Sequence, residues 1–250
     1  MACINHNSAR SIYIEMFFNE VKLSSGTGFF CESKVGSILF TNRHNVTGRN
    51  NDTGNTLSSS CAIPNKLRFT WLSSNGPITQ EIDLYEDDDM TVPAWAEHPK
   101  FGGRVDVVGL VLEKFKGEFP HYVSPYSSWH KWGVGSLVHV IGFPFSISAE
   151  GFAIWATGHI ASEPDVDYDG LPVFLIDCRT RQGQSGSQVI AQFNPGDTVK
   201  IKGRIYQAQY NMTYFLGIYS GRVNSESDIG KVWKASVIRD IIEFAENELK

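Results

Sequence analysis

Apolar residues along this chain gather in short segments that turn-forming residues separate. In the first half they lie at 11–18, 26–31, 36–41, 66–72, 79–84 and 105–112, and in the second half at 136–142, 151–156, 172–177, 188–193 and 214–219. These segments are rich in β-branched and aromatic residues, which favour strands. Because no helical pattern alternates with them, we predict an all-β protein built as barrels or as a sandwich, and not a parallel βαβ sheet.

One segment near the C-terminus follows a helical pattern instead. We predict a helix over 229–249, with Ser227 or Asp228 as its N-cap, because its apolar residues recur at helical spacing. These apolar residues are Val232, Trp233, Val237, Ile241, Phe244 and Ala245. The polar run at 48–60 is dense in turn formers and is predicted to be a loop.

An irregular stretch, aromatic and containing proline, divides the two strand-rich regions. We therefore expect one unit over 1–250, in which residues 10–115 form a first half, 116–132 a connector and 133–225 a second half. The helix at 229–249 is expected to pack against the second half.

Composition and charge argue against several classes of protein. The 250 residues are 42% hydrophobic and 20% charged, as in ordinary globular proteins. The formal net charge of −5 argues against a nucleic-acid-binding protein, which usually carries a basic surface. No apolar run approaches the roughly 20 residues that span a bilayer, and the first residues do not resemble a secretory signal. We predict a cytoplasmic protein without a membrane or nucleic-acid partner.

Cross-links by disulfides or metals are not indicated. The chain has four cysteines, Cys3, Cys31, Cys61 and Cys178. Their spacing shows neither a disulfide framework nor the close pair of a zinc site, so we predict free, mostly buried thiols in a reducing compartment. The acidic run at 86–89 is interpreted as a solvated loop. The run at 165–170 is interpreted as a turn, because the twelfth position of a calcium loop is Ile and not Glu. No metal or other cofactor is expected.

Three residues have the side chains that nucleophilic catalysis requires, in the chain order His, Asp, Ser. Ser185 lies in Gly-Gln-Ser-Gly-Ser, where glycines let the N–H groups of Gly183 and Ser185 converge as candidate oxyanion-hole donors. His44 follows an apolar segment and is the candidate base. Asp106 interrupts an apolar segment, and a buried carboxylate needs a partner such as an imidazole N–H. Taken alone, Ser185 also fits a turn between two strands and His44 a loop histidine, but the three residues together indicate a serine peptidase.

Six short motifs resemble those of the trypsin-like (chymotrypsin-fold) serine peptidases. They are Gly-Thr-Gly-Phe-Phe at 26–30, Thr-Asn-Arg-His at 41–44, Asp-Val-Val-Gly-Leu at 106–110, Val-Ile-Gly-Phe-Pro at 140–144, Gly-Gln-Ser-Gly-Ser at 183–187 and Gly-Ile-Tyr-Ser-Gly at 217–221. Those at 140–144 and 183–187 are similar to the bacterial HtrA-like and glutamyl-endopeptidase-like branch. The resemblance implies two antiparallel six-stranded β-barrels with a C-terminal α-helix. His44 and Asp106 from the first barrel and Ser185 from the second would face the cleft between them.

The chain departs from well-known members of this family at three points. No cysteine closely follows His44, no Ile-Val-Gly-Gly start occurs, and no PDZ domain follows the predicted helix. The resemblance is therefore to an intracellular, single-domain peptidase that needs no cleavage to free a new N-terminus.

The family resemblance also implicates a specificity pocket. In these peptidases it is formed by the segment before the nucleophile and by the strand that pairs with the substrate. The corresponding candidates for substrate binding are Arg179, Thr180, Tyr219, Ser220 and Gly221. An inward-pointing Arg179 would favour an acidic P1 residue through a charge-assisted hydrogen bond. If Arg179 points outward as a surface charge, Tyr219 would leave only a small apolar pocket.

The three candidate residues and the family resemblance together predict a serine endopeptidase that acts on protein or peptide substrates through an acyl-enzyme. One alternative is a latent or inactive protease-fold module that senses or binds a partner protein, with an activating partner that orders the oxyanion turn. A further alternative is a non-proteolytic esterase or a structural protein, which would turn over esters or nothing at all.

Overall fold

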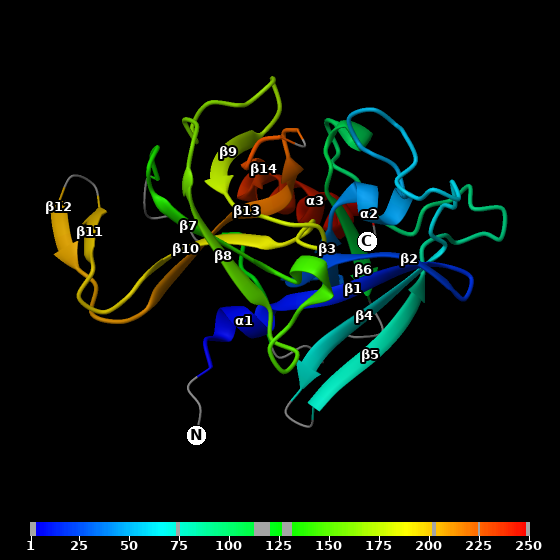
Figure 1. Cartoon of the computed structure of the whole chain (residues 1–250), viewed down its shortest axis with the longest axis horizontal. Helices are drawn as coiled ribbons and strands as arrows, with labels where there is room; N and C mark the ends of the chain where they lie inside the picture. Colours follow the sequence, from blue (N-terminus) through cyan, green and yellow to red (C-terminus); the bar gives the residue numbers. More distant parts are fainter. Residues whose placement is uncertain are drawn as a thin grey trace.

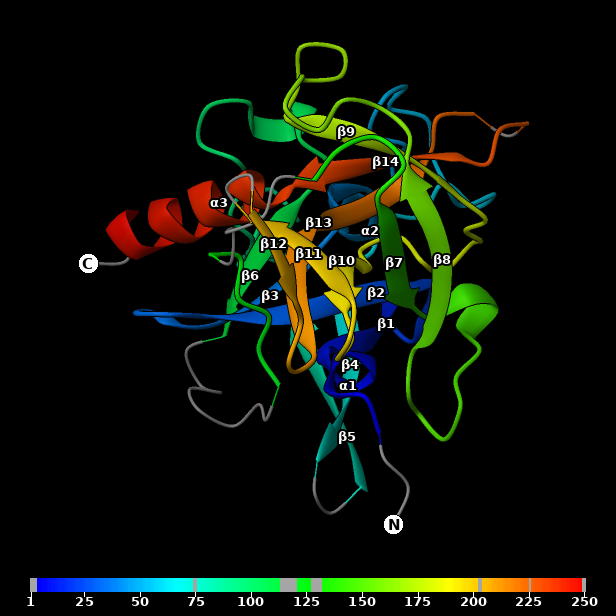
Figure 2. The same ribbon diagram turned by 90° about the vertical axis from the view of Figure 1, so that its left-hand side faces the viewer.

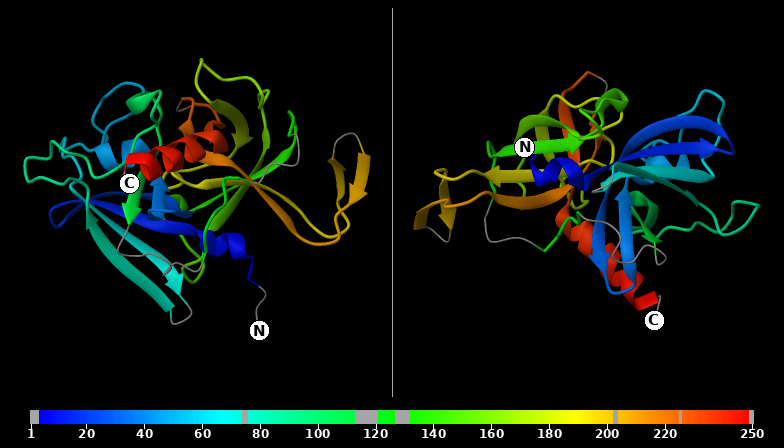
Figure 3. Two further views of the ribbon diagram at one scale, coloured as in Figure 1. Left: turned by 180° about the vertical axis from the view of Figure 1, so that it is seen from behind. Right: turned by 90° about the horizontal axis from the view of Figure 1, so that it is seen from below.

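A computed structural model describes residues 4–73, 76–112, 121–126, 132–201, 204–224 and 226–248. Strands make up two units that lie side by side, with the C-terminal helix α3 (Ala235–Glu248) behind them (Figure 1). The view from behind shows α3 running across the junction of the two units (Figure 3).

The first unit is an antiparallel sheet of six strands. Its strands are β1 (Ser11–Phe18), β2 (Val21–Ser33), β3 (Gly36–Thr41), β4 (Lys66–Ser73), β5 (Gly76–Asp83) and β6 (Val108–Leu112), in the spatial order β5-β4-β1-β2-β3-β6. The chain that follows β5 links this edge of the sheet to β6. Ala94 N donates to Leu84 O, and Ala96 exchanges two backbone hydrogen bonds with Gly109 of β6.

The second unit is a closed antiparallel barrel of six strands. Its strands are β7 (Leu137–Gly142), β8 (Ile154–Ile160), β9 (Val173–Cys178), β10 (Gln188–Phe193), β13 (Met212–Arg222) and β14 (Ile229–Lys234), in the order β10-β13-β14-β9-β8-β7. A separate hairpin of β11 (Thr198–Ile201) and β12 (Arg204–Gln207) projects outward between β10 and β13 (Figures 1 and 2).

A shared hydrophobic core fixes how the two units sit against each other. The Phe29 ring of β2 meets Phe215 of β13 edge-on, with ring centroids 5.3 Å apart. Helix α3 buries Ile238 and Ile241 in the same core. Each such side chain contributes about 1.5–3 kcal/mol of hydrophobic stabilisation. A Cβ on Gly109 would lie 3.1 Å from the Ile241 side chain, so the glycine allows the helix to approach β6 closely.

The expected all-β architecture, with two six-stranded units and a C-terminal helix, is confirmed. The predicted helix over 229–249 is wrong over its first turns, because Ile229–Lys234 is strand β14 and the helix begins at Ala235. Val232 and Trp233 fit a helical spacing, but hydrogen bonding to β9 and β13 on either side holds them in a strand. Long-range pairing thus overrides the local pattern.

Smaller elements also differ from the prediction. The strand predicted over 105–112 begins only at Val108, so Asp106 lies just before it and not within it. The short helices α1 (His6–Arg10) and α2 (Arg43–Thr47), the 3-10 turns η1 (Gly102–Arg104) and η3 (Pro144–Ser146), and the β11–β12 hairpin were not predicted. Of the connector predicted over 116–132, only 121–126 and 132 lie within the described residues, and they form no regular element.

Three of the four cysteines lie within the described residues. Cys31 and Cys178 are buried free thiols, and Cys61 is an exposed one. Burial raises the pKa of Cys178 to about 11, so its thiol stays protonated near neutral pH. In the part of the chain that the structure describes, none of the helices has the length and apolar character to cross a bilayer.

Candidate active site

A cavity of about 380 Å³ opens between the two units. The first unit contributes His44, Asp106 and the loop after α2, and the second contributes Gly183, Ser185 and the end of β13. The three residues predicted from the sequence to act together therefore line one cavity, although they lie far apart in the chain.

His44 is placed by the abrupt end of β3. The strand stops at Thr41, and Asn42 takes an extended conformation that starts helix α2 one residue before His44. Asn42 does not cap this helix with its side chain. Its Nδ2 instead donates to the backbone oxygen of Asp106 at 2.7 Å. Gly48 ends the helix in a left-handed conformation with φ of 62°. His44 is thus fixed at a strand-to-helix corner beside the Asp106 segment.

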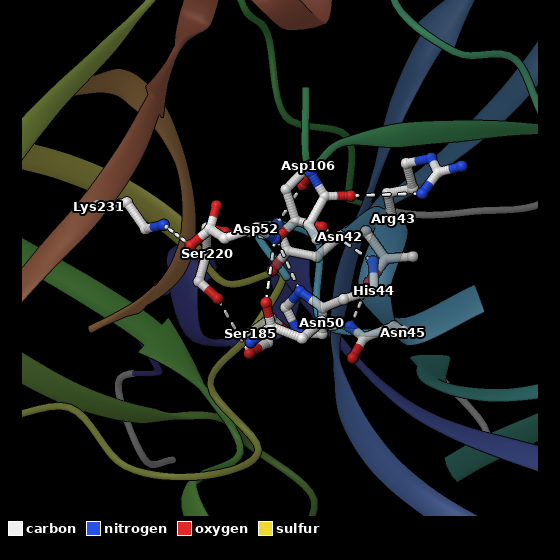
Figure 4. Close-up of polar contacts among 12 residues, drawn as sticks. Asn42, Arg43, His44, Asn45, Asn50, Asp52, Asp106, Ser185, Ser220 and Lys231 are labelled. Carbon is white, nitrogen blue, oxygen red and sulfur yellow. Dashed lines mark hydrogen bonds and ion pairs between the residues drawn. The ribbon is translucent and has the colours of Figure 1, made fainter. Parts of the chain in front are cut away.

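Asp106 is buried, with 4% of its surface exposed, and its carboxylate is fully engaged. Oδ1 accepts the backbone N–H of His44 at 2.8 Å, and Oδ2 lies 2.7 Å from His44 Nδ1. Ser220 Oγ donates to Oδ2 at 2.5 Å. An ionised carboxylate only accepts hydrogen bonds, so Nδ1 carries the proton and Nε2 of a neutral imidazole is left as an acceptor. Figure 4 shows these side chains together.

Ser185 lies on the turn between β9 and β10. Its Oγ donates to the backbone oxygen of Ser220 at 3.2 Å. Among the described residues, the hydrogen-bond partner of the Ser185 hydroxyl is therefore the Ser220 backbone oxygen and not His44. The serine and the imidazole line the same cavity, and the hydroxyl would have to leave Ser220 O before it could donate to the imidazole.

The same turn presents two unengaged backbone donors. Gly183 has φ of 93°, which favours glycine, and both Gly183 and Ser185 line the cavity. Within the described residues, neither of their N–H groups donates a hydrogen bond. Two free N–H groups beside a serine hydroxyl form an arrangement that can bind a carbonyl oxygen as it gains negative charge.

Groups outside the turn hold these donors in place. Thr27 of β2 donates from N to Ser185 O at 2.9 Å and from Oγ1 to Gly183 O at 2.8 Å. The Phe145 N–H of η3 donates to Gln182 O at 2.7 Å. Because the C=O and N–H of a trans peptide point in opposite directions, this bond turns the Gly183 N–H away from η3.

Comparison with known proteins yields structural matches only. No family model and no curated protein matches the sequence. The thermostable serine protease AL20 from an extremophilic microorganism is 13% identical, with a TM-score of 0.55 over 96% of this chain and 98% of that chain. The active form of the Rv3671c protease from M. tuberculosis is 16% identical, with a TM-score of 0.52 over 95% and 81% of the two chains. The serine endoprotease from Yersinia pestis is 12% identical, with a TM-score of 0.53 over 97% and 67%.

The chain has the fold of the trypsin-like serine peptidases. At these identities the likeness concerns the fold alone, so the chemistry of the cavity has to carry any statement about function.

The five residues predicted to bind substrate occupy different environments within this peptidase fold. Arg179 points outward, with 81% of its side chain exposed and its Nε 3.8 Å from Asp228. Thr180 and Tyr219 are buried, and their hydroxyl groups are hydrogen-bonded to each other. Burial raises the pKa of Tyr219 to about 12, so its hydroxyl stays neutral. Ser220 and Gly221 line the cavity.

Several residues that shape the site were not identified from the sequence. Ser220 was predicted to bind substrate, and the contact of its hydroxyl with Asp106 is an additional feature that the sequence did not reveal. Asn42 and Phe145 each act through one hydrogen bond to distant backbone, and Thr27 acts through two. Gln184 is buried and accepts the Arg181 N–H at 2.7 Å through Oε1, which tightens the turn before Ser185. Asn42 lies two positions before His44, and Gln184 directly precedes Ser185. This closeness in the sequence is the one signal that could have identified these two residues.

Proposed function

We propose that this chain is a serine endopeptidase that hydrolyses peptide bonds through Ser185, His44 and Asp106. The observation that supports this most directly is the buried Asp106 carboxylate, which binds both the backbone N–H and Nδ1 of His44. That contact leaves Nε2 as the basic atom in a cavity that also holds Ser185. The motifs at 140–144 and 183–187 support placing the enzyme with the bacterial HtrA-like and glutamyl-endopeptidase-like peptidases.

The proposed reaction has two acyl-transfer steps. Ser185 Oγ leaves Ser220 O and attacks the substrate carbonyl carbon while His44 Nε2 takes its proton. The carbonyl oxygen becomes negative and is bound by the N–H groups of Gly183 and Ser185. The imidazolium, stabilised by Asp106, gives its proton to the leaving amine as the C–N bond breaks. A water molecule, deprotonated by His44, then cleaves the acyl-enzyme ester and restores the Ser185 hydroxyl.

The test of this proposal is covalent labelling by a fluorophosphonate, read as the intact mass of the protein. Wild type is expected to gain one adduct per chain and Ser185→Ala none. Ser58→Ala is the control, because Ser58 is another serine that lines the same cavity; it should label like wild type. Cleavage of peptide amides as well as esters would distinguish a peptidase from a plain esterase.

A latent form is the second candidate, because the Ser185 hydroxyl is bonded to Ser220 O and not to the imidazole. In that case the folded wild type would resist the fluorophosphonate until a partner protein or a bound peptide changed the serine rotamer. Absence of labelling under every such condition, together with absence of peptide cleavage, would contradict the endopeptidase proposal.

The P1 preference is proposed to be for small side chains. The family resemblance places the pocket between residues 179–182 and 219–222, and the buried Tyr219 side chain reaches from one segment to the Thr180 hydroxyl of the other. A Cβ on Gly230 would lie 2.5 Å from this ring, so Tyr219 packs closely against β14. Because Arg179 points outward, it does not supply the cation that would favour an acidic P1 residue.

Replacing Tyr219 by valine is expected to enlarge the pocket. The rate constant kcat/KM for peptides with P1 Leu should rise about tenfold or more relative to P1 Ala, because added methylenes would gain a pocket to fill. Tyr214→Val is the matched control: it removes a buried tyrosine from the same strand β13, outside the cavity lining. An unchanged Leu to Ala ratio in Tyr219→Val would place the P1 pocket elsewhere.

A further inference from the structure

The end of strand β13 has an open edge in the cavity. Strand β10 pairs with β13 only as far as Ile218, whereas β14 stays paired with it to Arg222. Residues 220–222 line the cavity and, within the described part of the chain, carry no strand on the side away from β14. An extended peptide can add to such an edge by backbone hydrogen bonds. If the proposed function holds, the residue bound to Ser220 is P1 and the one opposite Gly221 is P2.

A lysine lies on the face of this edge that P2 would share. Gly221 of β13 pairs with Lys231 of β14, and directly opposed residues in a sheet point to the same face. A Cβ on Gly221 would meet no atom within 4 Å, so this face is open above the glycine. P2, Gly221 and Lys231 would thus form one row across three strands. The row spans about 10 Å, which is two strand spacings. A lysine at one end and an acidic P2 side chain at the other are long enough to meet above Gly221.

The ammonium group of this lysine already forms an ion pair with a carboxylate from the other unit. Lys231 Nζ lies 2.5 Å from Asp52 Oδ2, and both residues line the cavity (Figure 4). Asp52 sits at the tip of the loop after α2, where Asn50 Oδ1 accepts its backbone N–H at 3.0 Å. The ion pair therefore crosses the cleft from one unit to the other.

The two partners of this ion pair differ in how firmly they are placed. The Lys231 side chain is 21% exposed and rises from strand β14, which is paired on both sides in the barrel, whereas the Asp52 side chain is 67% exposed on a loop. Exposed ion pairs of this kind are weak and exchange easily with other partners. A carboxylate that a ligand brings into the cavity can therefore replace Asp52 on the Lys231 ammonium group.

We propose that Lys231 selects peptide substrates with an acidic residue at P2, and that Asp52 holds its place in the free enzyme. A P2 carboxylate, brought in by pairing of the peptide with residues 220–222, replaces Asp52 on the ammonium group. Lys231 is a specificity-determining residue in this role, and Asp52 is an internal competitor that limits the selectivity. The inference rests on the proposed function and names a substrate class for it.

The test compares two fluorogenic tetrapeptide amides, Ala-Ala-Glu-Ala and Ala-Ala-Gln-Ala, which differ only in charge at P2. Wild type is expected to prefer Glu by about three- to tenfold in kcat/KM, and the preference should shrink between about 0.05 M and 0.5 M NaCl because salt screens exposed charges. In Lys231→Gln the ratio should fall to about one. In Asp52→Asn it should rise by about two- to fivefold, since the competing carboxylate is gone.

Lys234→Gln is the matched control. Lys234 lies on the same strand β14 and forms an equivalent ion pair, with its Nζ 2.6 Å from Asp167, but it does not line the cavity. Its Glu to Gln ratio should equal that of wild type. Equal rates for the two peptides in wild type, or a ratio that Lys231→Gln leaves unchanged, would overturn the proposal. A preference for Lys at P2 that disappears in Asp52→Asn would overturn it in favour of Asp52 as the recognising group.

A binding measurement separates this inference from the proposed function. The affinity of Ser185→Ala for fluorescein-labelled peptides with P2 Glu or Gln can be followed by anisotropy without any catalysis. Tighter binding of the Glu peptide, lost when Lys231→Gln is added, supports the inference even where wild type neither labels nor cleaves. A labelled and active wild type whose inactive variant binds both peptides equally contradicts the inference and leaves the peptidase proposal standing.

Discussion

The variant Asp106→Asn is expected to fold normally and to lose about 10⁴-fold in kcat. The carboxylate accepts from His44 Nδ1 and from the His44 backbone N–H, so it fixes both the tautomer and the orientation of the ring. An amide at this position can donate a hydrogen bond to the imidazole. His44 would then be held with Nδ1 as the acceptor and with its proton on Nε2, where it cannot take the proton of Ser185. Steady-state rates on a peptide amide, alongside thermal unfolding, measure the effect.

Asp240→Asn provides the control for this substitution. Asp240 Oδ2 lies 3.1 Å from Nε2 of the buried His98, which makes a second His–Asp pair outside the cavity lining. Its replacement should alter stability slightly and leave kcat within about twofold of wild type. If Asp106→Asn kept kcat within tenfold of wild type while remaining folded, His44 would not act as the base proposed here.

How much the sequence predicts depends on whether a feature is local. His44, Asp106 and Ser185 could be proposed because serine chemistry requires those side chains, and the motifs around them are short and contiguous. The strands could be proposed because a segment rich in β-branched and aromatic residues favours a strand wherever its partner lies. Neither argument requires knowledge of the tertiary contacts.

The features that escaped prediction depend on residues far apart in the chain. Ser220 reaches Asp106 across 114 positions, and Lys231 reaches Asp52 across 179. Strand β14 was taken for a helix because its identity depends on pairing with β9 and β13, not on its own spacing. Arg179 points outward, with its Nε 3.8 Å from Asp228, and no local pattern reveals that direction. Such long-range contacts determine substrate specificity and the exact positions of the side chains in the cavity. These features therefore become visible only in the structure.

The variant Gly183→Ala is expected to lower kcat by about 10²–10³-fold, the cost of losing one oxyanion donor. Gly183 has φ of 93°, and an added Cβ would lie 2.4 Å from the backbone oxygen of Phe143, which cannot move aside as a flexible side chain could. The turn must therefore shift, and the Gly183 N–H with it. Initial rates on a peptide amide, and the affinity of a peptide aldehyde that mimics the tetrahedral intermediate, should fall together.

Gly196→Ala separates this effect from simple backbone strain. Gly196 has nearly the same φ, 95°, but an added Cβ there meets no atom within 4 Å, and the residue does not line the cavity. Both substitutions force alanine into a conformation that costs about 1–3 kcal/mol, so both should lower the free energy of unfolding. Only Gly183→Ala should also lose activity and aldehyde affinity. Because stability falls in both variants and catalysis in one, a loss confined to Gly183→Ala would assign its N–H to the transition state. Equal activity of the two variants would remove it from that role.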